Sequence, residues 1–212
     1  MYGQDEKTYF DYELSDDVYL NNALTLDQAN AIFNFFQNHW LFKWADAHND
    51  CEDRANAICI LLDQWNIPNY KGWVFSGYFL KGEQGTLINA WNYHVATAVP
   101  VNIDNIIYLF MIDPATLSQA ETIGYWANNV TEFPYSYYLI KYGNYYIFSA
   151  EFIQRDNWHW RDQENYRWTI EGLAGINGVA PDGEFYINAN RKLIERTRIE
   201  FNKLKYGGSP FR

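Results

Sequence analysis

The chain has 212 residues, of which 48% are apolar, and a formal net charge of −10. This length allows one medium domain with a sizeable core that needs neither disulfides nor a metal ion to fold. The negative charge disfavours binding to nucleic acid and to anionic membranes, and the apolar runs are too short to cross a bilayer. We therefore expect no nucleic-acid partner and no membrane insertion.

The first half of the chain carries two helix patterns. Thr25 opens a capping box (Thr-Leu-Asp-Gln), and the apolar residues that follow share one helical face as far as Trp40. A second helix is expected to begin at Cys51, with Asp50 as its N-cap, and to end before Pro68. Its apolar stripe predicts a buried helix whose N-terminus is directed at a functional group of the protein or at a ligand.

After the second helix the pattern changes to that of β-strands. Three segments have strand character: 73–80, 87–99 and 106–112. The third is nearly all apolar, which favours a central strand. We expect a short helix within 115–134, a hairpin over 137–149 and a closing amphipathic helix over 190–205. The segment 151–190 has no clear pattern.

Neither an internal repeat nor a low-complexity linker divides the chain. We therefore expect a single domain over residues 1–212, with a catalytic core at about 26–150 and an elaboration of unknown role at 151–212. No signal peptide is visible at the start. The sequence leaves the compartment open, including secretion after removal of an export signal.

Three residues with complementary chemistry occur in suitable contexts. Cys51 opens a predicted helix, His94 lies in a predicted strand, and Asp113 ends the next strand. A helix start favours a thiolate, an imidazolium would stabilise it further, and a carboxylate can fix the imidazole tautomer. Each residue alone has an ordinary structural explanation. Their order and contexts together predict a thiol–imidazole–carboxylate triad.

The acidic neighbours of the thiol oppose this prediction. Asp50, Glu52 and Asp53 flank Cys51, and nearby carboxylates raise the pKa of a thiol. Neighbours along a helix point in different directions, so we expect these side chains to fan away from the sulfur.

The remaining cysteine and histidines have weaker claims. Cys59 lies in mid-helix and is expected in the core, at about 12 Å from Cys51 along a helix axis, too far for a disulfide. His39, His48 and His159 have no obvious orienting partner. Because metal-ligand spacings and cofactor-binding motifs are not found, we expect neither a metal site nor a cofactor.

Residues 26–117 resemble the bacterial protein-glutaminase family, relatives of transglutaminases in the papain-like thiol superfamily. The resemblance rests on three motifs: Cys51-x-x-Arg54-Ala55, Ala90-Trp91-x-Tyr93-His94-Val95-Ala96 and Ile112-Asp113-Pro114. The segment Phe42-Lys43-Trp44 upstream of the cysteine is also similar to the family's pattern.

The resemblance implies an α+β, papain/transglutaminase-like fold, with N-terminal helices on an antiparallel β-sheet, the nucleophile at a helix start and a C-terminal helix. It implies hydrolysis of the side-chain amide of protein- or peptide-bound glutamine, which yields glutamate and ammonia through a thioester. Cys51, His94 and Asp113 would form the triad, and the partner would be a protein or peptide carrying an accessible glutamine.

The oxyanion of such a reaction needs two donors. The backbone amide of Cys51 is one candidate. Trp44 and Trp91 are candidates for the second donor, through an indole N–H, or for one wall of the acyl slot. Tyr93 is a further candidate for a substrate contact.

Other functions fit the same residues. A transglutaminase would pass the acyl group to lysine, and a cysteine peptidase would cleave the backbone with the same triad. Aromatic residues reach 19% of the chain, which also suits a non-catalytic module that binds glycans or proteins.

Overall fold

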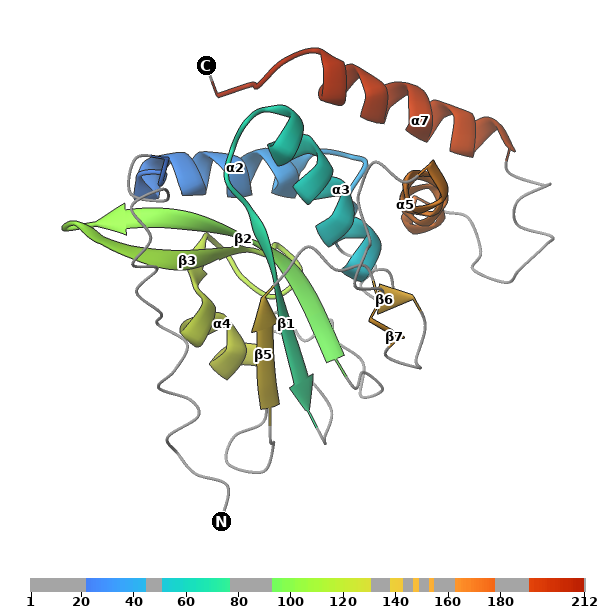
Figure 1. The fold of residues 1–212 in the computed structure, drawn as a ribbon. Coiled ribbons are helices and arrows are strands. Elements are labelled where there is room, and N and C mark those ends of the chain that lie inside the picture. The colour runs from blue at the N-terminus through green and yellow to red at the C-terminus, as the bar shows by residue number, and fades with distance from the viewer. Residues whose placement is uncertain are drawn as a thin grey trace.

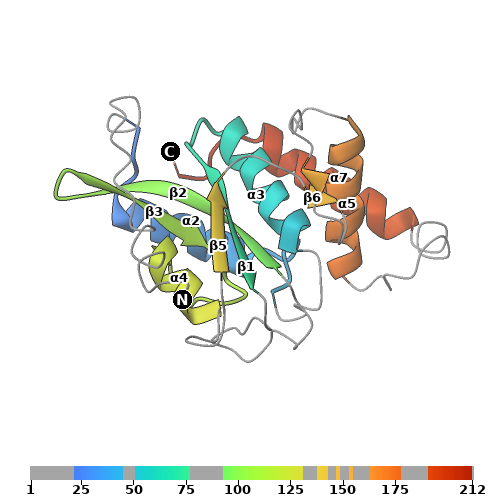
Figure 2. The ribbon, with the colours of Figure 1, turned by 60° about the horizontal axis from the view of Figure 1, so that its bottom comes forward.

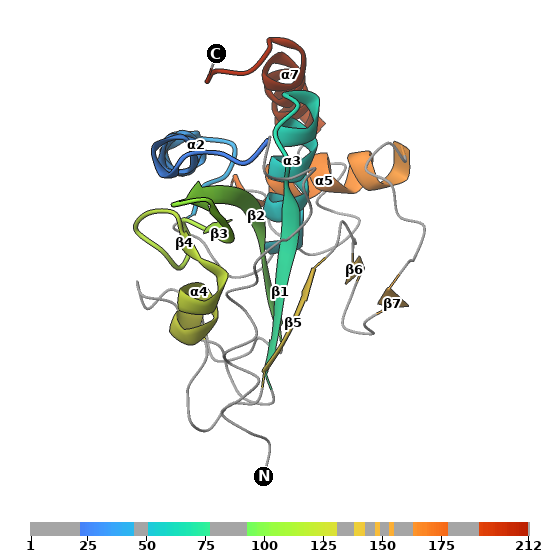
Figure 3. The same cartoon turned by 60° about the vertical axis from the view of Figure 1, so that its left-hand side comes forward.

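The structure is a computed structural model, and it describes residues 22–44, 51–76, 93–130, 138–142, 147–148, 153–154, 163–177 and 191–211. Its centre is a five-stranded antiparallel sheet with the order β4-β3-β2-β1-β5 (Figure 1; β4 is labelled in Figure 3). The strands are β1 (Tyr70–Ser76), β2 (Tyr93–Ile103), β3 (Ile106–Ile112), β4 (Glu121–Thr122) and β5 (Tyr138–Tyr142). Two short strands, β6 (Ile147–Phe148) and β7 (Ile153–Gln154), form a separate pair.

Helices cover both faces of the sheet, which confirms the predicted α+β class. They are α2 (Leu26–Asn38), α3 (Cys51–Gln64), α4 (Ile123–Val130), α5 (Gln163–Ile176) and α7 (Arg191–Tyr206). Figure 3 shows α2 and α3 on one face of the sheet and α4 on the other. In Figure 2, α5 and α7 lie together on one flank of α3, against which both pack. The α3 helix is therefore enclosed between the sheet and other helices.

The first helix begins where the capping box predicts. The hydroxyl of Thr25 accepts a hydrogen bond from the Gln28 backbone at 3.2 Å, and the Gln28 side chain accepts one from the Thr25 backbone at 2.9 Å. These two bonds satisfy N–H groups that a helix start otherwise leaves unpaired. The apolar face, which includes Phe33 and Phe36, is buried in the main core.

The α3 helix begins at Cys51, as the sequence predicts, and is buried along almost its whole length. It ends in a reversal in which the Ile67 N–H donates to the Leu62 carbonyl at 2.9 Å. Asn66 takes the positive φ of 58° that such a helix terminus requires. Its buried residues are mostly apolar but include the polar Asp53, Arg54 and Asn56.

The β2–β3 hairpin turns through Asp104 and Asn105, whose φ angles are 53° and 69°. Positive φ at both turn residues is characteristic of a tight two-residue turn, and asparagine and aspartate tolerate it well. β3 has its predicted bounds, whereas β2 continues to Ile103, four residues past its predicted end. The first predicted strand is observed as β1, and residues 77–80 and 87–92 lie outside the described residues.

One prediction from the later sequence needs correction. The hairpin over 137–149 is wrong, because β5 pairs with β1 and β6 pairs with β7. The edge of the large sheet offers β5 a longer buried partner than a two-residue strand does. The segment 151–190, which has no clear sequence pattern, contains α5, and this helix packs on α3. The predicted helices within 115–134 and at 190–205 are confirmed as α4 and α7.

Among the helices of the described residues, none combines the length and the apolar character needed to cross a membrane.

Candidate active site

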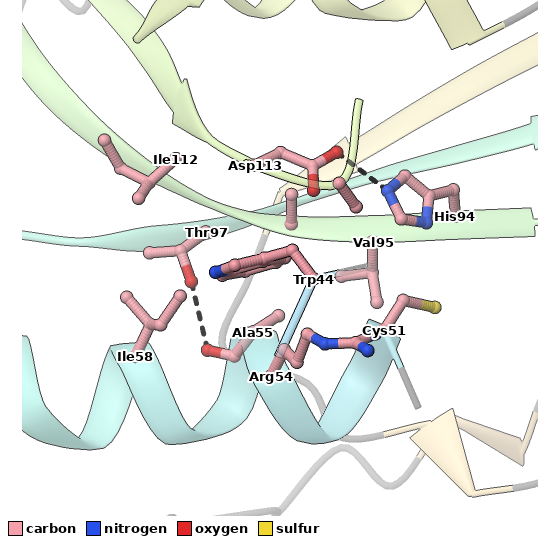
Figure 4. A pocket seen from close by; sticks show the side chains of 12 residues that line it. Trp44, Cys51, Arg54, Ala55, Ile58, His94, Val95, Thr97, Ile112 and Asp113 are labelled. Carbon is pink, nitrogen blue, oxygen red and sulfur yellow. Dashed lines mark hydrogen bonds and ion pairs between the residues drawn. The ribbon is translucent and has the colours of Figure 1, made fainter. Parts of the chain in front are cut away.

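A pocket opens between the start of α3 and the adjoining ends of β2 and β3 (Figure 4). Its lining includes all three residues of the predicted triad. The complete lining is Trp44, Cys51, Arg54, Ala55, Ile58, His94, Val95, Ala96, Thr97, Ile112, Asp113 and Ala115. The predicted residues thus come from one helix and two neighbouring strands, although up to 62 positions separate them (113 − 51).

His94 and Asp113 are in direct contact. The Nε2 atom of His94 lies 2.8 Å from Oδ2 of Asp113, and both side chains are about 2% exposed. The pairing of β2 with β3 explains this contact, since Thr97 lies opposite Ile112 at the end of their ladder. The hairpin therefore returns the chain to the same end of the sheet, where a residue just past Ile112 can meet His94.

The Asp113 carboxylate has two further donors on the same oxygen. The hydroxyl of Thr116 donates to Oδ2 at 2.5 Å, and the indole N–H of Trp126 donates to it at 2.8 Å. Burial raises the pKa of Asp113, but the charge of His94 and the bonds from His94, Thr116 and Trp126 outweigh it and hold that pKa below its usual value. Asp113 is consequently a carboxylate at neutral pH.

An ionised Asp113 accepts and does not donate, so the hydrogen in its bond with His94 resides on Nε2 of the imidazole. In the neutral ring the other nitrogen, Nδ1, is then the proton acceptor. In Figure 4 this nitrogen faces the end of the pocket at which Cys51 lies. The ring of His94 also packs against Trp126 of α4, with the ring centroids 5.7 Å apart.

Cys51 is the first residue of α3 and is 7% exposed. Its sulfur packs with Ala55, Trp73 and Val95 in a small apolar cluster, and its thiol donates to Oε2 of Glu52 at 3.2 Å. A backbone hydrogen bond links it to Val95, the residue after His94. Cys51 therefore lies beside the strand that carries the imidazole.

Two expectations about this thiol are wrong. Burial raises the pKa of Cys51 well above its ordinary value, and the charge and hydrogen bond of Glu52 raise it further. The backbone bond from Val95 and the charge of Arg54 oppose this shift without cancelling it. The helix start therefore does not make a resting thiolate, and Glu52 does not point away from the sulfur.

The other acidic neighbours differ in position. The side chain of Asp53 does point away from the Cys51 sulfur. Its carboxylate lies against Gly172 of α5, so close that a Cβ atom at position 172 would overlap it. The absence of a side chain at Gly172 makes room for this buried carboxylate. Asp50, the predicted N-cap, lies outside the described residues.

Arg54 connects the start of α3 to the segment that precedes it. Its guanidinium donates to the Phe42 carbonyl at 2.8 Å and to the Lys43 carbonyl at 3.2 Å, and lies 5.4 Å from the centre of the Trp44 ring. The fixed fork of donors on arginine suits two neighbouring carbonyls. These contacts give a structural reason for the joint presence of the Phe-Lys-Trp segment and the Cys-x-x-Arg motif.

Trp44 lines the pocket as a wall. Its indole N–H donates to the Phe36 carbonyl at 2.9 Å, so it is engaged within the protein and directed away from the reacting centre. The suggestion that Trp44 supplies an oxyanion donor is therefore wrong for this arrangement. Trp91 and the side chain of Tyr93 lie outside the described residues, although Tyr93 opens β2.

The remaining cysteine and histidines lie away from this pocket or outside the described part. Both cysteines are free thiols, and Cys59 is buried against Thr97 and the Tyr70 carbonyl, as expected for a core residue. His39 follows α2, where its ring accepts a hydrogen bond from the Leu41 backbone at 3.3 Å. His48 and His159 lie outside the described residues.

In the described part of the chain, no group of three or more histidine, cysteine, aspartate or glutamate side chains is arranged to hold a metal ion.

Sequence reasoning missed Thr116 and Trp126. Thr116 follows Asp113 by three positions, a spacing typical of side-chain bonds in turns, so a signal existed. Trp126 comes from a separate helix, and nothing in its local sequence marks it as a partner of Asp113. Such contacts depend on how α4 packs under the sheet.

Comparisons with known proteins give one matching family model and several solved structures with a similar fold. The model of a protein family described as glutaminase matches residues 29–130, the segment that contains all three predicted triad residues. No curated protein matches the chain. A crystal structure of protein-glutaminase is similar with a TM-score of 0.55 and 21% identity over 76% of this chain and 94% of that one.

Two more solved structures show the same fold. A crystal structure of pro-protein-glutaminase has a TM-score of 0.54 and 20% identity, over 79% of this chain and 64% of that one. The NMR structure of protein-glutaminase from Chryseobacterium proteolyticum has a TM-score of 0.51 and 19% identity, over 76% of this chain and 93% of that one.

Proposed function

We propose that this chain, which belongs to the protein-glutaminase family, hydrolyses the side-chain amide of glutamine in proteins and peptides through Cys51, His94 and Asp113. The observation that carries the proposal is the common pocket of these three residues, in which Asp113 already holds the imidazole at 2.8 Å. The products are protein-bound glutamate and ammonia.

In the first half of the reaction Cys51 attacks the amide carbon. Because the thiol is neutral at rest, the attack requires a base, and Nδ1 of His94 takes the thiol proton as the carbon–sulfur bond forms. A rotation about the Cα–Cβ bond of Cys51 moves the sulfur from Glu52 towards the imidazole. The imidazolium then protonates the departing nitrogen, the carbon–nitrogen bond breaks, and ammonia leaves a thioester on Cys51.

In the second half water replaces ammonia. His94 takes a proton from water as the water oxygen attacks the thioester carbon. The carbon–sulfur bond then breaks, glutamate leaves, and the imidazolium returns its proton to the sulfur to restore the thiol. Asp113 stays ionised throughout and stabilises the imidazolium that forms in each half. The backbone N–H of Cys51, at the positive end of α3, supports the oxyanion.

The wall residues fit an extended amide chain. Ala55, Ala96 and Ala115 are small, and with Trp44 they line the same pocket as Cys51. A glutamine side chain has an apolar stem and an amide head, so a narrow pocket with apolar walls and the triad at one end suits it.

An ammonia-release assay tests this proposal. Casein, a glutamine-containing peptide and free glutamine are each incubated with the protein, with and without a primary amine. The proposal requires ammonia from casein, no new N-termini, and little amine incorporation. Dominant amine incorporation would make the protein a transglutaminase, and backbone cleavage would make it a peptidase.

A further inference from the structure

One oxygen of Asp113 is held by donors from three parts of the fold. Oδ2 accepts from His94 on β2, from Thr116 in the turn after β3, and from Trp126 on α4. Thr116 and Trp126 are fully buried, and Asp113 and His94 almost fully. Donor sets of this kind fix a carboxylate more firmly than one contact can, because the competing solvent is excluded.

We propose that Thr116 and Trp126 are positioning residues: they fix the Asp113 carboxylate so that it keeps His94 in the tautomer and ring orientation needed for proton exchange with Cys51. This inference rests on the proposed function and adds two residues to its machinery. Neither side chain lines the pocket, so both act through Asp113 and His94.

The turn that contains Thr116 is built around Asp113. The backbone N–H groups of Thr116 and Leu117 donate to the Asp113 carbonyl at 3.1 and 3.0 Å. The Thr116 hydroxyl bonds the side chain of the same aspartate. Backbone and side chain of Asp113 are thus held by one short segment, and the hydroxyl can be removed without breaking the turn.

Trp126 touches both the acid and the ring that the acid orients. Its N–H donates to Asp113 at 2.8 Å while its ring lies against the His94 imidazole, tilted by 36°. A tryptophan that serves the core alone can satisfy its N–H on a backbone carbonyl, as Trp65 does on Leu204 at 3.1 Å. Trp126 instead donates its N–H to the buried carboxylate of Asp113, and its ring limits the motion of the His94 imidazole.

The shared oxygen also has an electrostatic consequence. Each donor spreads part of the charge of Asp113, so loss of one makes the carboxylate a stronger partner for the imidazolium.

The test compares Thr116→Val with Thr116→Ser, and Trp126→Phe with the wild-type protein. Thr116→Val and Trp126→Phe should lower kcat on casein by roughly tenfold, the loss expected for one hydrogen bond to a charged group, with KM changed less than about twofold. Thr116→Ser keeps the hydroxyl and should restore most of kcat. The matched controls are Thr197→Val and Trp65→Phe, two buried sites remote from the pocket, which should retain wild-type kcat and pH profile.

A second measurement does not depend on activity. The proton NMR signal of the His94 Nε2–H, assigned with His94→Gln, should shift in Thr116→Val and Trp126→Phe and stay in place in Thr116→Ser. Unchanged signals in both variants, or equal losses of kcat in Thr116→Val and Thr116→Ser, would overturn the proposal. If the wild-type protein releases no ammonia, the proposed function fails while the NMR comparison still decides the role of these two residues. If Trp126→Phe does not fold, the Thr116 pair decides.

Discussion

The carboxylate of Glu52 lies 3.2 Å from the sulfur of Cys51 and accepts its thiol hydrogen. After burial, it is the main reason for the raised pKa of this thiol. The site at rest therefore favours the neutral thiol, and in the proposed mechanism the imidazole acts as a base in the attack itself.

Removing the Glu52 charge should make Cys51 more reactive. In Glu52→Gln the amide neither repels the thiolate nor accepts as strongly from the thiol, so the pKa of Cys51 falls. Alkylation by iodoacetamide at neutral pH should become several-fold faster. The pH at which the alkylation rate reaches half of its maximum should be lower than in the wild-type protein. The surface variant Glu195→Gln on α7 is the control. An alkylation profile unchanged from the wild-type protein would mean that Glu52 does not govern the thiol.

Neutralising Asp113 should reduce turnover without removing substrate binding. In Asp113→Asn, Thr116 and Trp126 still hold the side-chain oxygen, so the geometry is preserved while the charge that stabilises the imidazolium is lost. We expect kcat to fall by about 100-fold or more and KM to change little. Steady-state ammonia release with casein measures both constants, and a kcat near that of the wild-type protein would contradict the assigned role of Asp113.

Trp44 should matter through its shape and not through its N–H. Because the indole donates to the Phe36 carbonyl, Trp44→Phe keeps much of the wall and should leave kcat within about threefold of wild type, far from the roughly 10²-fold loss expected for an oxyanion donor. Trp44→Ala removes the wall and should raise KM more than it lowers kcat. A loss of kcat in Trp44→Phe as large as that for an oxyanion donor would reinstate the indole as that donor.

Lys71 should make stability depend on pH. It is buried in β1, where its ammonium donates to Asn56 at 2.9 Å, and Asn56 in turn donates to Thr169 of α5 at 2.6 Å. Burial lowers the pKa of Lys71 from 10.5 to about 8, against the raising effect of Cys59 and two carboxylates. Above about pH 8 the unfolded chain therefore binds more protons at this residue than the folded one, and its contribution to stability rises with pH.

The comparison with Lys71→Met isolates this effect. The difference in free energy of unfolding, wild type minus variant, should grow by about 1 kcal/mol between about pH 8 and about pH 9. Urea unfolding at several pH values measures it. Cys59, whose pKa is raised to about 11, contributes in the opposite direction in both proteins, and the subtraction reduces its influence. A difference that is flat or falls across this range would contradict the prediction.

The parts of the fold that depend on local pattern were predictable. The capping box at Thr25 and the helix start at Cys51 follow from sequence rules that act over three or four residues. β3 was predicted at its observed bounds because a short, continuously apolar run favours a buried strand. These elements carry Cys51 and bring His94 and Asp113 to one end of the sheet.

Pairings between distant segments were not predictable. The segment 137–149 contains residues that suit a hairpin turn. The pairing of β5 with β1 depends instead on a free edge of the large sheet, which no local sequence pattern reveals. The contact between Glu52 and Cys51 was misjudged for a different reason. Cβ atoms of helix neighbours diverge, yet a long glutamate side chain can bend back to the residue before it.

The most direct test of the triad is to locate deamidated glutamines in casein by mass spectrometry after incubation with the wild-type protein and with Cys51→Ala. The variant removes one sulfur from a site whose fold does not depend on a disulfide, so its unfolding midpoint and circular dichroism should match the wild type. We predict conversion of glutamine to glutamate by the wild-type protein and none above the enzyme-free background by a folded Cys51→Ala. Conversion by the variant at the wild-type rate would show that the nucleophile lies elsewhere.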